Sequence, residues 1–179
     1  MEKTIRASIL ISLVLIFSVT AAEEQVNDYY RKGNEFFQAE KYDEAIEQYQ
    51  QAIALQPDYP EAHYNLGVAY QKKNMLPEAS SEYREALKFL PQLHQAHYNL
   101  GIIYGKTEEI DQGIESYQKA IELYPDYADA HYNLACLYSE SGSYYEAWKH
   151  FKKAEELGIP GCSELIDEML SRVMEQKEQ

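Results

Sequence analysis

The apolar positions of this chain recur with helical spacing, and the pattern repeats along most of its length. One apolar stripe at helical spacing runs from Ala62 to Tyr70, and a polar turn follows at Lys73 and Asn74. A second stripe then runs from Ala79 to Leu90 and stops at Pro91, because a helix does not continue through a residue that lacks an N–H group. The pattern predicts a pair of helices joined by a short turn.

The pentapeptide Ala-His-Tyr-Asn-Leu occurs at residues 62–66, 96–100 and 130–134, which sets a repeat period of 34 residues. A fixed period between 20 and 50 residues is typical of stacked helical or sheet units, since one unit alone does not bury its apolar face. Alignment at this period gives four repeats, which are residues 26–59, 60–93, 94–127 and 128–161. Each of the first three ends near a proline, and the fourth has Pro160, displaced by one position.

Small and large residues occupy matched positions in every repeat. The small ones in the first helix are Gly33, Gly67, Gly101 and Ala135, and those in the second are Ala45, Ala79, Gly113 and Ala147. The large ones are Phe36, Tyr70, Tyr104 and Tyr138, followed by Tyr49, Tyr83, Tyr117 and Phe151. We expect the two helices of a repeat to pack antiparallel, with large side chains filling the space over small ones.

This residue pattern resembles the tetratricopeptide repeat family. The second repeat matches at Leu66-Gly67, Tyr70, Ala79, Tyr83, Ala86 and Pro91, and the third at Leu100-Gly101, Tyr104, Tyr117, Ala120 and Pro125. The resemblance covers residues 26–161 and implies an all-α fold, a right-handed α-solenoid of stacked antiparallel helix pairs. The chain departs from the family at His63, His97 and His131, where Trp is frequent, and at Lys32, where Leu is frequent.

The two ends of the chain differ from the repeats. Lys3 and Arg6 precede an uncharged, apolar run that ends at Ala22, which is typical of a secretory signal peptide over residues 1–22. We expect cleavage after Ala21 or Ala22, a short segment at 23–25 and a periplasmic or secreted protein with no membrane attachment. The alternative is an uncleaved N-terminal membrane anchor.

Residues 162–179 predict one more helix, with Ser163 as its N-cap. Its apolar stripe consists of Leu165, Ile166, Met169, Leu170, Val173 and Met174. The stripe favours a helix that caps the end of the stack, and the alternative is a dimerisation or partner-binding helix, because Met-rich surfaces adapt to partners. Cys136 and Cys162 leave open whether a disulfide forms, although the repeat register places them at different heights along their helices.

Composition argues against nucleic-acid binding and catalysis. The net charge is −14 and no run of basic residues occurs, whereas a phosphate backbone requires clustered Lys and Arg. His63, His97 and His131 are separated by whole repeats of about 10 Å, while metal ligands lie about 2 Å from their ion. His94 and His97 lack a third ligand, and no catalytic or phosphate-binding motif is present. We therefore predict that the protein is not an enzyme and holds no cofactor or metal.

The resemblance implies a concave groove lined by the first helix of each repeat, and this groove is our candidate site for a protein or peptide partner. The candidate residues are Tyr30, Arg31, Asn34, Tyr64, Asn65, Val68, Tyr98, Asn99, Ile102, Tyr132 and Asn133. An Asn side chain offers two donors and one acceptor, so a row of them suits the backbone of an extended peptide. Some tetratricopeptide proteins use such an asparagine ladder. A clamp for a terminal carboxylate is disfavoured, because Tyr stands at the position of its Lys.

Two alternatives to this groove remain open at the level of sequence. The Tyr-Asn pairs could serve only helix packing and solubility. The protein could also be a structural or assembly subunit of an envelope complex that uses its convex face or C-terminal helix. The sequence does not decide the oligomeric state.

Overall fold

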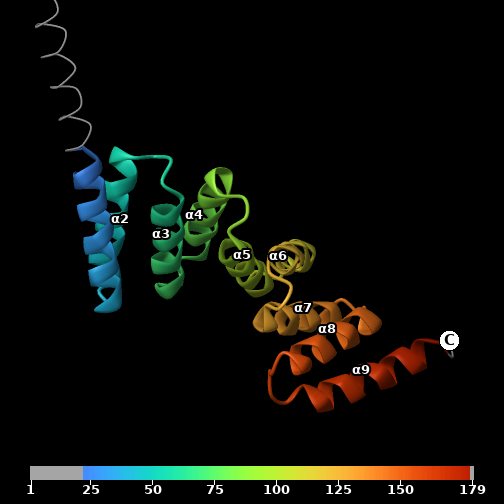
Figure 1. Cartoon of the computed structure of the whole chain (residues 1–179). Coiled ribbons are helices and arrows are strands. Elements are labelled where there is room, and N and C mark those ends of the chain that lie inside the picture. Colours follow the sequence, from blue (N-terminus) through green and yellow to red (C-terminus); the bar gives the residue numbers. More distant parts are fainter. Residues whose placement is uncertain (1–21, 178–179) are drawn as a thin grey trace, which may run out of the picture. The chain divides into compact units, whose positions relative to one another are not determined.

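The structure is a computed structural model that describes residues 22–177, and all the regular elements in that range are helices (Figure 1). The predicted signal peptide lies outside the described residues except for Ala22. Residues 22–38 are helical. The helices that follow are α2 (Tyr42–Leu55), α3 (Pro60–Lys72), α4 (Leu76–Phe89), α5 (His94–Lys106), α6 (Ile110–Leu123), α7 (Ala128–Glu140), α8 (Tyr144–Glu156) and α9 (Cys162–Lys177). None of the described helices is long and apolar enough to cross a membrane.

The helices form two compact parts, an N-terminal half that ends at Phe89 and a C-terminal half that begins at Leu90. In the N-terminal half, α3 packs on α2 and on α4. In the C-terminal half, α5 packs on α6, α6 on α7, α7 on α8 and α8 on α9. The protein therefore has the all-α fold of stacked helix pairs that the repeat predicts.

The turn inside each helix pair has the same backbone structure in all four repeats. Its residue with a left-handed conformation is Glu40, Asn74, Glu108 or Gly142, with φ between 58° and 78°. The next N–H group donates to a carbonyl five residues earlier, as in Met75 to Tyr70 at 2.9 Å and Glu109 to Tyr104 at 2.9 Å. This is a Schellman-type ending, which satisfies free carbonyls of the first helix and lets the chain turn back at once.

Close approach of the two helices depends on glycine in three repeats. A Cβ atom added to Gly67 would lie 2.8 Å from the ring of Tyr83, and one added to Gly101 would lie 2.6 Å from the ring of Tyr117. Large side chains of the second helix thus fill the space over small residues of the first, as the sequence predicts. The absence of a Cβ lets the tyrosine ring lie against the helix backbone.

The last helix is only partly covered. Met169 joins the buried core of Ala135, Ala147 and Phe151, whereas Leu170 and Met174 are 47% and 55% exposed. Both cysteines are free thiols; Cys162 is buried and Cys136 is half-buried.

Candidate functional site

The predicted groove residues lie on the first helix of each pair. In the N-terminal half, Tyr30, Arg31 and Asn34 lie on the helix of residues 22–38, and Tyr64, Asn65 and Val68 lie on α3. In the C-terminal half, Tyr98, Asn99 and Ile102 lie on α5, and Tyr132 and Asn133 lie on α7. All of them except Arg31 are half-buried. Most of these residues therefore contribute to packing as well as to the surface.

The four groove tyrosines pack on the aromatic ring of the second helix in their own repeat. The ring centroids of Tyr30 and Tyr49 are 6.0 Å apart, and those of Tyr98 and Tyr117 are 5.7 Å apart. The pairs Tyr64–Tyr83 and Tyr132–Phe151 have similar separations of 5.7 and 5.6 Å. Aromatic pairs at this distance stabilise a fold beyond the area that they bury.

Asn65 uses its amide group to connect two neighbouring repeats. Its Nδ2 donates to the Tyr30 hydroxyl at 2.9 Å and to Asn34 Oδ1 at 3.0 Å. The hydroxyl of Tyr49 donates to the same Asn34 oxygen at 2.8 Å. Burial, followed by the nearby Tyr30, raises the pKa of Tyr49, so this hydroxyl stays protonated as a donor.

Asn133 repeats this arrangement in the C-terminal half, where its Nδ2 donates to the Tyr98 hydroxyl at 3.1 Å. Burial and the charge of Asp129 raise the pKa of Tyr98, and the hydrogen bond from Asn133 opposes them. The donors that the sequence hypothesis assigned to a bound peptide are thus engaged inside the protein. Asn133 also forms a side-chain hydrogen bond with Tyr117. Among the described residues, Oδ1 of Asn65 accepts no hydrogen bond, so this amide retains an acceptor.

A pocket of about 160 Å³ lies at these amide groups in the N-terminal half. Its lining consists of Asn34, Phe37, Gln38, Tyr49, Asn65 and Val68. Arg31 does not line it, because its guanidinium pairs with Asp28 at 2.6 Å and with Glu35 on its own helix. Its lining is half apolar or aromatic and half neutral amide side chains, which suits a peptide group or an uncharged side chain.

The histidine of the pentapeptide has a structural role that sequence reasoning missed. Its Nε2 atom lies within hydrogen-bond distance of a proline carbonyl oxygen six residues earlier. The pairs are His63 with Pro57 at 3.0 Å, His97 with Pro91 at 3.0 Å, and His131 with Pro125 at 2.9 Å. A carbonyl only accepts, so each Nε2 carries the hydrogen. The histidine therefore ties the first helix of a repeat to the turn that precedes it.

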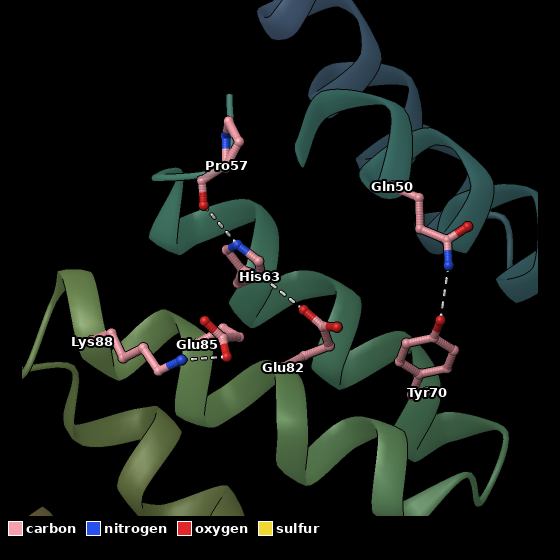
Figure 2. Close-up of polar contacts among 7 residues, drawn as sticks. All are labelled: Gln50, Pro57, His63, Tyr70, Glu82, Glu85 and Lys88. Atoms are coloured by element: carbon pink, nitrogen blue, oxygen red, sulfur yellow. Dashed lines mark hydrogen bonds and ion pairs between the residues drawn. The ribbon is translucent and has the colours of Figure 1, made fainter. Parts of the chain in front are cut away.

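The residue 19 positions after each of these histidines differs between repeats, and for His63 and His131 it contacts the other ring nitrogen. Nδ1 of His63 lies 2.7 Å from Glu82 Oε2 (Figure 2), and Nδ1 of His131 lies 2.9 Å from Nδ1 of His150. The corresponding residue for His97 is Ser116. The 34-residue register could have indicated these pairs, because each partner follows its histidine at the same separation. No group of three or more His, Cys, Asp or Glu side chains in the described part of the chain could hold a metal ion.

Profiles described as tetratricopeptide or TPR repeat match the sequence at residues 33–74, 60–93, 94–127 and 116–149. Together these matches run without a gap from residue 33 to residue 149, which is more than half of the chain. No curated protein matches the sequence.

Several solved structures resemble this one. MamA is 28% identical with a TM-score of 0.72, and the match covers 78% of this chain and 82% of MamA. YrrB, a TPR protein with an unusual peptide-binding site, is 22% identical with a TM-score of 0.71 over 80% of this chain and 74% of its own. The first TPR of Spaghetti (RPAP3), bound to the HSP90 peptide SRMEEVD, is 23% identical with a TM-score of 0.63 over 65% of this chain and 93% of its own.

The likenesses to YrrB and Spaghetti concern the fold. The repeated pentapeptide, the four equivalent turns, the glycine–tyrosine contacts and the four profile matches all describe one kind of repeat. The chain belongs to the tetratricopeptide repeat family.

Proposed function

We propose that this protein is an exported, non-enzymatic scaffold that binds an extended peptide or partner segment along the first helices of its repeats. The observation that carries the proposal is the pocket of about 160 Å³ formed by Asn34, Asn65, Val68 and their neighbours. It combines apolar or aromatic side chains with amides at the positions where the family resemblance places the groove. YrrB has a peptide-binding site and the Spaghetti domain binds a peptide, which supports the same class of partner for this chain.

The contacts that we propose differ from those of an asparagine ladder in which both amide groups of every Asn are available to the peptide. Since Asn65 Nδ2 is engaged by Tyr30 and Asn34, its Oδ1 is the atom offered to a peptide N–H. The amide nitrogen of Asn34 donates no hydrogen bond to another described residue, so it is offered to a peptide carbonyl. The two groups together complement one peptide unit, and the half-buried Val68 and Ile102 supply apolar contact in the two halves.

Selection from a random peptide display library tests this proposal. The double variant V68K/I102K places a long charged side chain at the groove position of each half. We expect it to fold, because the aliphatic part of Lys can pack on the helix while the ammonium group stays in solvent. The control S81K/Q112K adds the same charge at exposed positions of the second helices α4 and α6. We expect peptides enriched on the wild type and the control to lose binding to V68K/I102K. Equal binding to all three proteins would contradict the groove.

Export is a proposal that rests on the sequence of residues 1–22 alone. We propose cleavage at Ala21 or Ala22 and a location in the periplasm or outside the cell, with four repeats and the terminal helix as the mature protein. Determination of the mature N-terminus after expression with the complete N-terminal segment tests it. A chain that starts at Glu23 or Ala22 would support cleavage, and an intact Met1 in the membrane fraction would support an anchor instead.

A second candidate function is assembly through α9, and one observation favours it. Leu170 and Met174 leave an apolar strip on the outer side of the helix, at 47% and 55% exposure. If this strip is an assembly surface, the variant L170E/M174E should sediment as a smaller species than the wild type at the same concentration. Identical sedimentation, with helicity unchanged, would remove this candidate.

A further inference from the structure

His131, which is buried, and His150, which is half-buried, form an imidazole pair between α7 and α8. Their Nδ1 atoms are 2.9 Å apart, and their ring centroids are 5.1 Å apart at an angle of 29°. His131 is 6% exposed, and the ring of His150 stacks on Tyr138 with centroids 5.7 Å apart. His150 is therefore held by a hydrogen bond with His131 and by stacking on Tyr138.

The hydrogen bonds determine which nitrogen of each ring carries a proton. Nε2 of His131 donates to the Pro125 carbonyl at 2.9 Å, so in the neutral ring Nδ1 of His131 is a bare acceptor. The hydrogen between the two Nδ1 atoms must then belong to His150, which donates it. One added proton leaves this hydrogen bond in place, because one Nδ1 atom still donates and the other still accepts. A second added proton would put two N–H groups face to face at 2.9 Å, so the pair keeps this geometry only while at least one of its rings is neutral.

The equivalent place in the N-terminal half favours the charged state of its ring. His63 faces two acceptors, the Pro57 carbonyl at 3.0 Å and the Glu82 carboxylate at 2.7 Å, so the site favours an imidazolium that donates from both ring nitrogens (Figure 2). The Glu82 carboxylate lies where His150 lies in the C-terminal half. The same position of the repeat thus favours a charged ring in the N-terminal half and a neutral ring in the C-terminal half.

We infer that the two halves respond to acid in opposite directions: protonation of both rings of the His131–His150 pair loosens α7 from α8, whereas the His63–Glu82 pair holds α3 on α4. The protein would then partly open its C-terminal half in mild acid while its N-terminal half stays folded. His131 directly precedes Tyr132 and Asn133, so binding along α7 would weaken as the pH falls. Only this consequence for binding rests on the proposed function.

The charged groups around the pair do not compensate for protonation. Lys149 and Lys153 on α8 disfavour a further positive charge, and Glu146 on α8 and Asp126 before α7 favour it. Asp126 is already paired with Lys153 at 3.3 Å, and Glu146 with Lys149 at 2.9 Å. The α7 helix adds Tyr138, and α9 contributes apolar side chains to its contact with α8.

The pKa directions agree with the geometry. Burial, followed by the neighbouring His131 and Lys149, lowers the pKa of His150 from 6.5 to about 4, and burial also lowers that of His131. Burial opposes the charge of His63 as well, but the bonds to Glu82 and Pro57 outweigh it and raise its pKa. A lowered histidine pKa means that the unfolded chain binds more protons, so stability falls as the pH drops below about 6.5. The raised pKa of His63 stabilises its half below that same pH, and this contribution disappears as the pH rises.

Hydrogen exchange of the full chain measures the protection of the two halves separately. The exchange is resolved by peptide and corrected for the intrinsic rate at each pH. From pH 7.5 to pH 5, we expect protection of α7 and α8 to fall about 25-fold through His150 alone. Protection of α3 and α4 should not fall through His63. The variant His150→Glu recreates the carboxylate of the N-terminal half and should abolish the fall. His150→Gln keeps a neutral donor that does not titrate and should abolish it as well.

The reciprocal variant Glu82→His should create an acid-dependent loss of protection in α3 and α4. Proton NMR of the five histidines of the wild type gives an independent measurement, in which His150 titrates below and His63 above the ordinary midpoint. The inference is overturned if the two halves lose protection in parallel. It is also overturned if His150→Gln retains the fall, or if His63 and His150 titrate at the same pH. The NMR result decides the question should the variants not fold.

Discussion

Two glycines on α5 test whether the contact between glycine and tyrosine holds each helix pair together. A Cβ atom on Gly101 would lie 2.6, 2.7 and 2.9 Å from Cε1, Cδ1 and Cγ of Tyr117. The Tyr117 ring is 4% exposed and packs on Tyr98, so it has little room to move aside. Gly105 lies one turn later on the same helix, where a Cβ would make an ordinary contact of 3.5 Å with Leu137.

The pair of variants cancels the effect of helix propensity. Replacement of Gly by Ala inside a helix stabilises it by about 1 kcal/mol, and this gain is common to Gly101→Ala and Gly105→Ala. Overpacking of a rigid core costs about 1–3 kcal/mol and applies to Gly101 alone. We therefore expect Gly105→Ala to stabilise the C-terminal half, and Gly101→Ala to be less stable than Gly105→Ala by about 1–3 kcal/mol.

Urea unfolding followed by tryptophan fluorescence measures this difference, because Trp148 is the single tryptophan of the chain and lies on α8 in the same half as both glycines. A double-mutant cycle provides the control: in a Tyr117→Leu background the ring is absent, and the penalty of Gly101→Ala should disappear. Equal stability of Gly101→Ala and Gly105→Ala would refute the packing explanation, as would a penalty that persists without the ring.

Three further predictions concern the turns, the amide network and the thiols. Glu108→Gly should stabilise the chain by about 0.5–1 kcal/mol, because a left-handed residue with a Cβ is strained. Gly142→Glu should destabilise it by about 1–2 kcal/mol for the same reason, and urea unfolding measures both changes. Asn65→Ala should cost about 1–3 kcal/mol of unfolding free energy in the N-terminal half, and a loss near zero would show that its two hydrogen bonds contribute nothing. Burial raises the thiol pKa of both Cys136 and Cys162, and Cys162 is 0% exposed. Alkylation should therefore be slow for Cys136 and should reach Cys162 only after unfolding. Equal alkylation rates for the native and the unfolded protein would contradict this.

The candidate site was predictable only in part. The repeat register places Tyr30, Asn65 and Asn133 on the first helices, and the structure has them there. The state of their polar atoms was not predictable, because an Asn side chain suits a peptide and a neighbouring Tyr equally well. The distances of 2.9 and 3.1 Å to the tyrosine hydroxyls show that the amide donors hold repeats together within each half.

The sequence by itself determined the helix pairs, their turns and their family, since these depend on local spacing that recurs every 34 residues. Recurrence makes one repeat evidence for the next, and a stripe of apolar residues is enough to define which face of a helix is buried. Only the tertiary structure decided how the repeats differ from one another. His63 and His131 occupy the same place in the pentapeptide, yet one faces a carboxylate and the other an imidazole. The physical reason is that hydrogen bonding and charge depend on which atoms lie opposite each other across the helix interface. The repeat register gives the residue 19 positions after each histidine, but only the packed helices show that its side chain reaches the ring.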